Sequence, residues 1–186
     1  IVENVKKIRK SRRRAAGWLV VWGGMLLFLG MNVQYMVSYF RRVDPIGYLT
    51  GEFSRVEYLK RHVREYQSLQ YINTHLPSHS RILFLFLGNR GYYCDRPYVL
   101  DRGAKAFSQM IKGENRPEKV LSHLRATGIT HLLIRYDIFD RWKNDPYTFT
   151  NQERFLLNQF MKKYTKPLYA KNNYIVFLLR RKSSAF

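Results

Sequence analysis

The sequence has a single cysteine, Cys94, among its 186 residues. One cysteine cannot form a disulfide within the chain, and a structural zinc site built on cysteine needs several thiolates. Acidic residues are also few, with 13 Asp and Glu against 33 Lys and Arg, so the formal net charge is +20. Hydrophobic residues make up 46% of the chain and aromatic residues 16%. This content excludes a chain that is disordered over most of its length.

Motifs that identify common enzymes are missing as well. Gly88-Asn89-Arg90-Gly91 follows a predicted strand but lacks the glycine spacing of the dinucleotide-binding fingerprint and of the P-loop. His75 and His79 are separated by Pro77, which prevents them from sharing one helical face. We interpret the histidines and Cys94 as ordinary structural positions. The sequence therefore predicts no catalytic residue, no metal ligand and no cofactor.

One long hydrophobic run is present near the N-terminus. No charged residue occurs from Ala15 to Phe40. The segment 15–36 has about 22 residues, and as a helix it measures about 33 Å, which matches the apolar core of a bilayer. Aromatic residues typical of membrane interfaces lie near its two ends: Trp18, Trp22, Tyr35 and Tyr39. The run predicts a transmembrane helix over 15–36, and it is too long for a cleaved signal peptide.

The charges on the two sides of this span differ. Residues 1–14 carry seven Lys and Arg and one Glu, whereas only Arg41 and Arg42 follow the span closely. Positive charge next to a span stays in the cytoplasm. We expect a basic cytoplasmic segment over 1–14, a linker over 37–53, and residues 43–186 outside the cytoplasm.

Small residues recur along the predicted span. Ala16, Gly23 and Gly30 are seven residues apart, with Gly17 and Gly24 beside them. Such a stripe is typical of a surface against which another membrane helix packs. The chain also starts with Ile1 inside the basic segment. We therefore expect other transmembrane helices of a longer parent protein as partners.

Residues 54–186 predict one small α/β sandwich. Its mixed sheet is expected to begin with parallel strands and to end in a β-hairpin around Lys171-Asn172-Asn173. Capping boxes at Ser54/Glu57 and Thr150/Glu153 mark two helix starts. A linker is expected at 44–51, and a loop containing Trp142, Asp145 and Pro146 before the last helix. The expected helices are 54–76 in one or two parts, 104–111, 117–127 and 151–164, and the strands are 81–87, one within 92–100, 129–135, 168–170 and 174–179.

The candidate binding residues follow the first strand. They are Tyr92, Tyr93, Arg96, Asp101 and Arg102. Ligands in open α/β sheets bind outside the carboxyl ends of the strands, where tyrosine rings can stack on sugars and arginines can hold phosphate. The alternative is that these arginines form ion pairs with Asp95 or Asp101, and that the tyrosines fix a long loop to the sheet.

The charge of the outer part indicates its partners. Residues 43–186 contain 24 basic and 12 acidic residues. No nucleic-acid-binding signature is visible, and nucleic acid is not expected outside the cytoplasm. Anionic lipid headgroups or acidic glycans at a membrane surface fit this charge better.

Short segments resemble the part that follows the last membrane helix in bacterial multi-span glycosyltransferases of the GT-C architecture, the group of the protein mannosyltransferases and aminoarabinose transferases. The resembling positions are Gly51, Ser54-Arg55, Glu57-Tyr58-Leu59, Arg61, Tyr66, Tyr71-Ile72-Asn73, Leu76-Pro77, the strand 81–87, Tyr92-Tyr93, Asp95-Arg96 and Gly128-Ile129-Thr130-His131-Leu132-Leu133.

This resemblance implies a parent hexosyltransferase in the bacterial inner membrane, part of the cell-envelope machinery, that transfers a sugar from a polyprenyl-phosphate donor. The catalytic carboxylates of that group lie in an early outer loop, which this chain does not contain. The present chain would then be an accessory domain that is inactive alone. The alternative is a single-span, membrane-anchored basic domain that binds anionic glycan or lipid without catalysis.

Overall fold

The computed structural model describes the backbone of residues 2–180 and the side chains of residues 17–180. The chain divides into two compact units, residues 1–58 and residues 59–186. Each unit is described by itself.

Unit 1 is dominated by helix α1, Val2–Val43. Its segment Gly17–Val43 is 27 residues long and apolar enough to cross a membrane, and no part of its most apolar window is buried in the structure. The helix extends beyond Met36 and ends where Asp44 adopts a left-handed conformation, with φ 46°. The Asp44 N–H donates to the carbonyl of Phe40 at 2.9 Å and so closes the last turn.

Two short helices follow α1. Helix α2, Pro45–Leu49, lies within the segment 44–51 that the sequence predicts as a linker. Pro45 is at the first helical position, where its fixed φ favours a helix and its missing N–H is not needed. Helix α3, Arg55–His62, starts with the predicted capping box: the Ser54 N–H donates to Glu57 at 2.8 Å, and the Glu57 N–H donates to the Ser54 hydroxyl at 3.2 Å.

Unit 2 contains a mixed five-stranded sheet in the order β2-β1-β3-β5-β4. Strand β1 pairs in parallel with β2 and with β3, whereas β5 pairs antiparallel with β3 and with β4. This confirms the predicted α/β class, with parallel strands first and a hairpin last. The strand bounds are Ile82–Leu85 (β1), Tyr98–Asp101 (β2), His131–Arg135 (β3), Thr165–Lys171 (β4) and Tyr174–Leu179 (β5).

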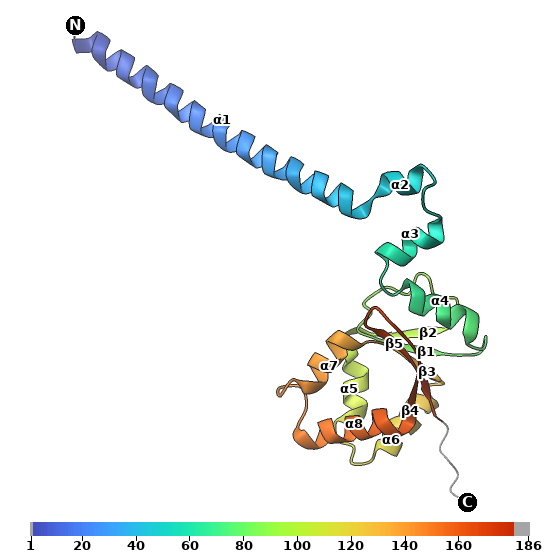
Figure 1. The fold of residues 1–186 in the computed structure, drawn as a ribbon. Helices are drawn as coiled ribbons and strands as arrows, with labels where there is room; N and C mark the ends of the chain where they lie inside the picture. The colour runs from blue at the N-terminus through green and yellow to red at the C-terminus, as the bar shows by residue number, and fades with distance from the viewer. Residues whose placement is uncertain (1, 181–186) are drawn as a thin grey trace, which may run out of the picture. The chain divides into compact units, whose positions relative to one another are not determined.

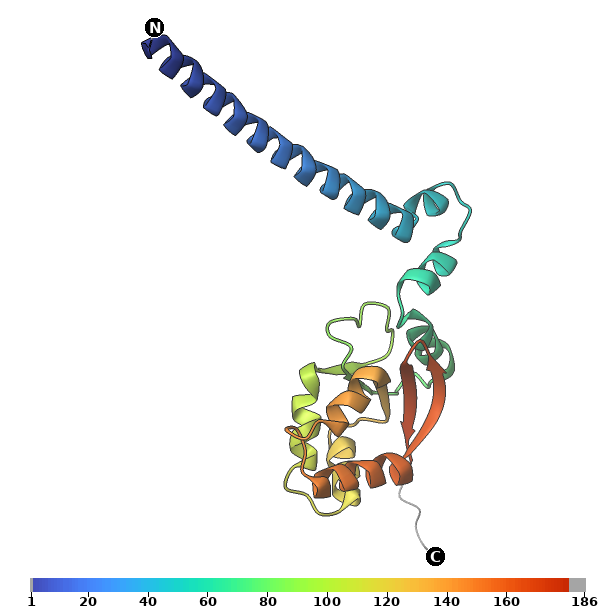
Figure 2. The ribbon, with the colours of Figure 1, turned by 60° about the vertical axis from the view of Figure 1, so that its left-hand side comes forward.

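Helices cover both faces of this sheet (Figures 1 and 2). Helix α4 lies on one face, where Leu69 and Ile72 pack on Ile82 and Phe84 of β1. The opposite face packs against the other helices through Leu83 and Leu85 of β1. Neighbouring residues of β1 thus face opposite cores, as expected for a strand buried on both sides. The helix bounds are Tyr66–His75 (α4), Lys105–Ile111 (α5, preceded by the 3-10 turn η1, Arg102–Ala104), Pro117–Ala126 (α6), Tyr136–Asn144 (α7) and Asn151–Tyr164 (α8).

The predicted start and stop signals of unit 2 are confirmed. Thr150 and Glu153 form the capping box of α8. Helix α6 ends in a Schellman motif, in which the N–H of Ile129 donates to Leu124 and that of Gly128, at φ 76°, donates to Arg125. Asn172 and Asn173 both have positive φ, which is the type I′ geometry that joins two hairpin strands.

Two details of the prediction were wrong. The residues around Trp142 form helix α7 instead of a loop, because Phe139 and Trp142, three residues apart on one helical face, both pack on the core. Strand β4 begins at Thr165, immediately after α8, and not at Leu168, because its first residues pair with the end of β5.

Candidate functional site

The predicted binding segment, Tyr92–Arg102, follows β1 and includes β2. Because β2 is parallel to β1, the chain must return from the carboxyl end of β1 to the amino end of β2. Arg96 therefore precedes β2 at the amino edge of the sheet, and Arg102 follows β2 at the carboxyl edge. A four-residue strand separates them, at about 3.3 Å per residue. The structure does not bring the two arginines together.

Arg96 binds the C-terminal end of α4. Its Nε and Nη2 donate to the carbonyl of Leu76 at 3.2 and 3.1 Å, and Nη2 also donates to the carbonyl of Asn73 at 2.6 Å. A cation at this end of a helix satisfies carbonyls that lack intrahelical partners and interacts favourably with the helix dipole. The Asn73 side chain completes the contact, since it donates to Tyr93 O at 2.8 Å and accepts from Asp95 N at 2.9 Å.

Asp101 is a helix cap. Its carboxylate is 8% exposed and accepts hydrogen bonds from the N–H groups of Ala106 at 3.1 Å and Phe107 at 2.7 Å. These N–H groups belong to the first turn of α5, where no intrahelical acceptor is available. The carboxylate therefore connects the end of β2 to the start of α5.

The remaining three predicted residues differ in exposure. The Tyr93 ring is half-buried and packs edge-on against Tyr66, with ring centroids 5.3 Å apart. Tyr92 is 83% exposed and contacts the edge of Tyr93. Arg102 is exposed, and its side chain makes no hydrogen bond or ion pair within residues 17–180. Tyr92 and Arg102 are therefore accessible to a ligand, and their binding role stays a prediction.

The alternative was that arginines of this segment pair with Asp95 or Asp101. Within residues 17–180, neither Arg96 nor Arg102 forms such an ion pair. The loop is fixed to the fold, but Arg96 contacts backbone carbonyls and not a carboxylate. Ion pairs lie elsewhere at the carboxyl edge. Arg135 donates to Asp137 at 3.0 Å and thereby lowers the pKa of that carboxyl, and Arg90 lies 3.5 Å from the buried Glu65.

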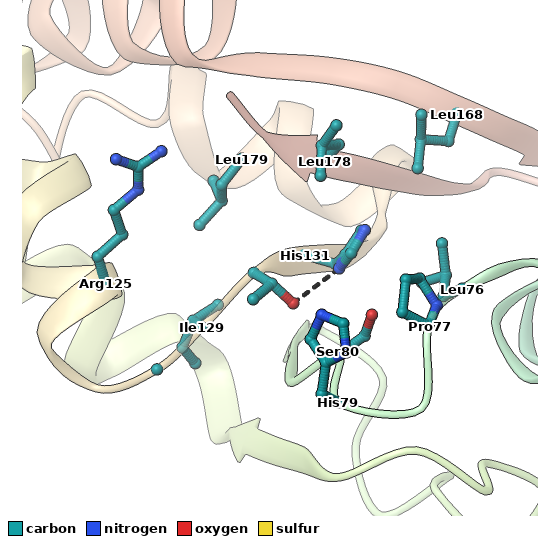
Figure 3. A pocket seen from close by; sticks show the side chains of 12 residues that line it. Leu76, Pro77, His79, Ser80, Arg125, Ile129, His131, Leu168, Leu178 and Leu179 are labelled. Carbon is teal, nitrogen blue, oxygen red and sulfur yellow. Dashed lines mark hydrogen bonds between the residues drawn. The ribbon is translucent and has the colours of Figure 1, made fainter. Parts of the chain in front are cut away.

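A cavity of about 950 Å³ lies at the opposite, amino edge of the sheet (Figure 3). The residues just before β1 and β3 form one side of it, since the amino ends of these parallel neighbours meet there. The cavity is lined by Leu76, Pro77, His79, Ser80, Arg125, Gly128, Ile129, Thr130, His131, Leu168, Leu178 and Leu179. None of these twelve residues is acidic.

His131 is the most buried ionisable group of this cavity, at 5% exposed. Its Nδ1 lies 2.8 Å from the hydroxyl of Thr130 (Figure 3), and this hydroxyl also contacts both backbone groups of Arg81. Burial, and in second place the nearby His79, lowers the pKa of His131 below its ordinary value of 6.5. The ring is therefore neutral at pH 7, and Nδ1 is held by Thr130.

Sequence reasoning did not identify this cavity. The two histidines were interpreted as ordinary polar positions, although His79-Ser80 directly precedes β1 and Thr130-His131 directly precedes β3. Parallel neighbouring strands place such residues at one edge, so the pairing of β1 with β3 was the missing information. Among residues 17–180, no three His, Cys, Asp or Glu side chains lie close enough together to hold a metal ion.

No protein-family model matches the sequence. No curated protein matches it either. Among solved structures, the chain is similar to the C-terminal globular domain of an oligosaccharyltransferase from Archaeoglobus fulgidus, with a TM-score of 0.40 and 10% sequence identity over 63% of this chain and 97% of that chain.

Proposed function

We propose that this chain is the membrane-anchored accessory part of an integral-membrane glycosyltransferase that takes a sugar from a polyprenyl-phosphate donor. The observation that carries the proposal is helix α1, whose segment Gly17–Val43 is apolar and unburied within the described structure. Such a surface needs lipid or other membrane helices around it. The stripe of Gly17, Gly23, Gly24 and Gly30 is open, since an added Cβ at any of them would meet nothing within 4 Å.

The accessory role is supported by the structural roles of two polar residues of unit 2. Asp101 caps α5 and Arg96 caps the end of α4, so both are used to build the fold. The catalytic carboxylates would come from another part of the parent protein. Tyr92 and Arg102 are the groups of the predicted segment that we propose to contact the glycan, through ring stacking and phosphate binding respectively.

The orientation is part of the proposal. The seven cations before residue 15 support an N-terminus in the cytoplasm, and we propose residues 43–186 outside it, at a bacterial inner membrane. Anionic phospholipids or glycans would attract unit 2 to that surface through its excess of cations.

The second candidate is a single-span protein whose basic domain binds anionic glycan or lipid without catalysis. The acid-free cavity at the amino edge of the sheet favours it. The coding sequence upstream of Ile1 distinguishes the two candidates. An in-frame series of hydrophobic spans with an early acidic outer loop supports the glycosyltransferase, and a start codon directly upstream contradicts it.

A further inference from the structure

The cavity at the amino edge of the sheet has two chemically different parts (Figure 3). Its walls are mainly apolar, with Leu76 and Pro77 after α4, Leu168 on β4 and Leu178 on β5. Leu168 and Leu178 are half-buried, so they present apolar surface to the cavity while they belong to paired strands. An apolar chain would bury this surface and would itself be removed from water, which favours binding.

The polar part is formed by His79, Ser80 and His131. Ser80 is only 1% exposed and lines the cavity. Figure 3 draws its hydroxyl on the side of the cavity where His131 lies. A serine hydroxyl can donate one hydrogen bond and accept others. A ligand oxygen at this place would accept a hydrogen bond from the Ser80 hydroxyl.

The cavity is lined by a basic residue and by no acidic residue. Arg125 lines the cavity beyond Ile129 and Leu179, and its Nη2 donates to the carbonyl of Arg180. The cavity thus offers a hydroxyl and two imidazoles, with a guanidinium further along its wall, and groups of these kinds hydrogen-bond to phosphate.

We propose that this cavity binds a phosphorylated amphiphile, with the phosphate at Ser80, His79 and His131 and the apolar chain along Leu168 and Leu178. This site is distinct from the Tyr92–Arg102 segment, and its occupation does not depend on the glycosyltransferase proposal. The Nε2 atom of His131 faces the phosphate, because Nδ1 is already held by Thr130. A phosphate dianion there favours the protonated imidazole and so opposes the effect of burial on the ring.

The experiment uses the full chain in dodecyl maltoside micelles, with its five histidines labelled at Cε1 for NMR. The probes are hexyl phosphate, hexanoate, hexanol and inorganic phosphate. We expect hexyl phosphate to move the signals of His79 and His131 and to leave those of His62, His75 and His123 in place. Hexanol and inorganic phosphate each lack one part of the ligand, and hexanoate lacks the dianion, so each should bind at least about ten-fold more weakly.

Two variants on β4 form a matched pair. Leu168→Glu places a carboxylate in the apolar wall, whereas Ala170→Glu places the same charge on the same strand at an exposed position outside this cavity. Leu168→Glu should weaken hexyl phosphate binding about ten-fold or more, and Ala170→Glu should leave it within two-fold. Ser80→Ala removes one hydroxyl while the fold is retained, and it should weaken binding about three-fold to ten-fold.

The proposal is contradicted if hexyl phosphate moves none of the five signals or all of them alike. Equal weakening by Leu168→Glu and Ala170→Glu would show attraction to the general charge of the surface and would also contradict it. Binding of hexanoate as tight as that of hexyl phosphate overturns the assignment to phosphate. Loss of transferase activity in the parent protein is not a readout here, so the outcome stands apart from the proposed function.

Discussion

Arg96 and Leu76 are joined by two hydrogen bonds from one guanidinium to one carbonyl oxygen, with Nε at 3.2 Å and Nη2 at 3.1 Å. The contact spans 20 positions and ties the loop before β2 to the end of α4. It gives an arginine that was predicted to bind a ligand a demonstrable role in the fold. Arg102 is exposed, and its side chain makes no hydrogen bond within residues 17–180, so it is a suitable control for Arg96.

We predict that Arg96→Ala lowers the free energy of unfolding by about 1.5–3 kcal/mol, because charged hydrogen bonds to partly buried carbonyls are lost. Arg102→Ala should change it by less than about 0.5 kcal/mol, as for other exposed positions. Urea unfolding of both variants in detergent, followed by near-UV circular dichroism, measures the difference. Equal stabilities would remove the structural assignment of Arg96.

Ser68 offers a test of the core on the α4 face. It is fully buried in α4, and its hydroxyl has no hydrogen-bond partner among the described residues. Ser68→Ala removes an unpaired polar group and introduces a better helix former, so we expect stability to rise by about 1 kcal/mol. Ser122→Ala, at an exposed position of α6, serves as the control and should have little effect. A loss of stability in Ser68→Ala would show that the hydroxyl has a partner, such as a buried water.

The buried imidazole of His131 predicts how stability depends on pH. Its pKa is lowered in the folded state, so the unfolded chain binds more protons in the pH range just below 6.5. The free energy of unfolding should therefore fall as the pH drops through 6.5. His131→Gln should remove this part of the pH dependence, whereas His75→Gln on the surface of α4 should keep it. A pH profile that is unchanged in His131→Gln contradicts the assignment.

Much of the fold could be predicted from local patterns. The continuous apolar runs before Gly88 and Tyr136 predicted strands buried on both faces, and Pro117 with Gly128 predicted both ends of α6. These signals depend on residues that are close together in the chain, so the sequence alone could predict these strands and helix ends. The hairpin turn at Asn172-Asn173 is of the same kind, since its positive φ values suit asparagine.

Other features depend on tertiary contacts and could not be predicted in this way. Helix α7 was missed because Asp145-Pro146 indicated a loop, whereas the packing of Trp142 on Phe149 and Phe86 stabilises a helix up to Asn144. The role of Arg96 depends on carbonyls of a helix some 20 residues away. The separation of Arg96 from Arg102 follows from the parallel pairing of β1 and β2, which the sequence predicted only in general terms.

The proposed membrane orientation has its own test. A reporter that is active only outside the cytoplasm, fused after Phe186, should be active, and a cytoplasm-only reporter at the same site should be silent. Replacing Arg12, Arg13 and Arg14 together by alanine should shift part of the signal to the inside reporter, because charges this close to the span set its direction. An inside-only signal in the unmodified chain would exclude an outer domain and restore nucleic acid as a partner.

The most direct measurement of the central proposal is sugar transfer from a labelled polyprenyl-phosphate sugar. It is made in membranes that contain the full-length product of the gene, the same product without residues 59–186, or the present chain alone. We predict transfer by the full-length protein, at least about ten-fold less without residues 59–186, and none by the present chain, because Asp101 caps α5 and Asp137 pairs with Arg135, and we expect the catalytic carboxylates in another part of the parent protein. Transfer by the present chain alone, or its absence from the full-length protein, would contradict the account.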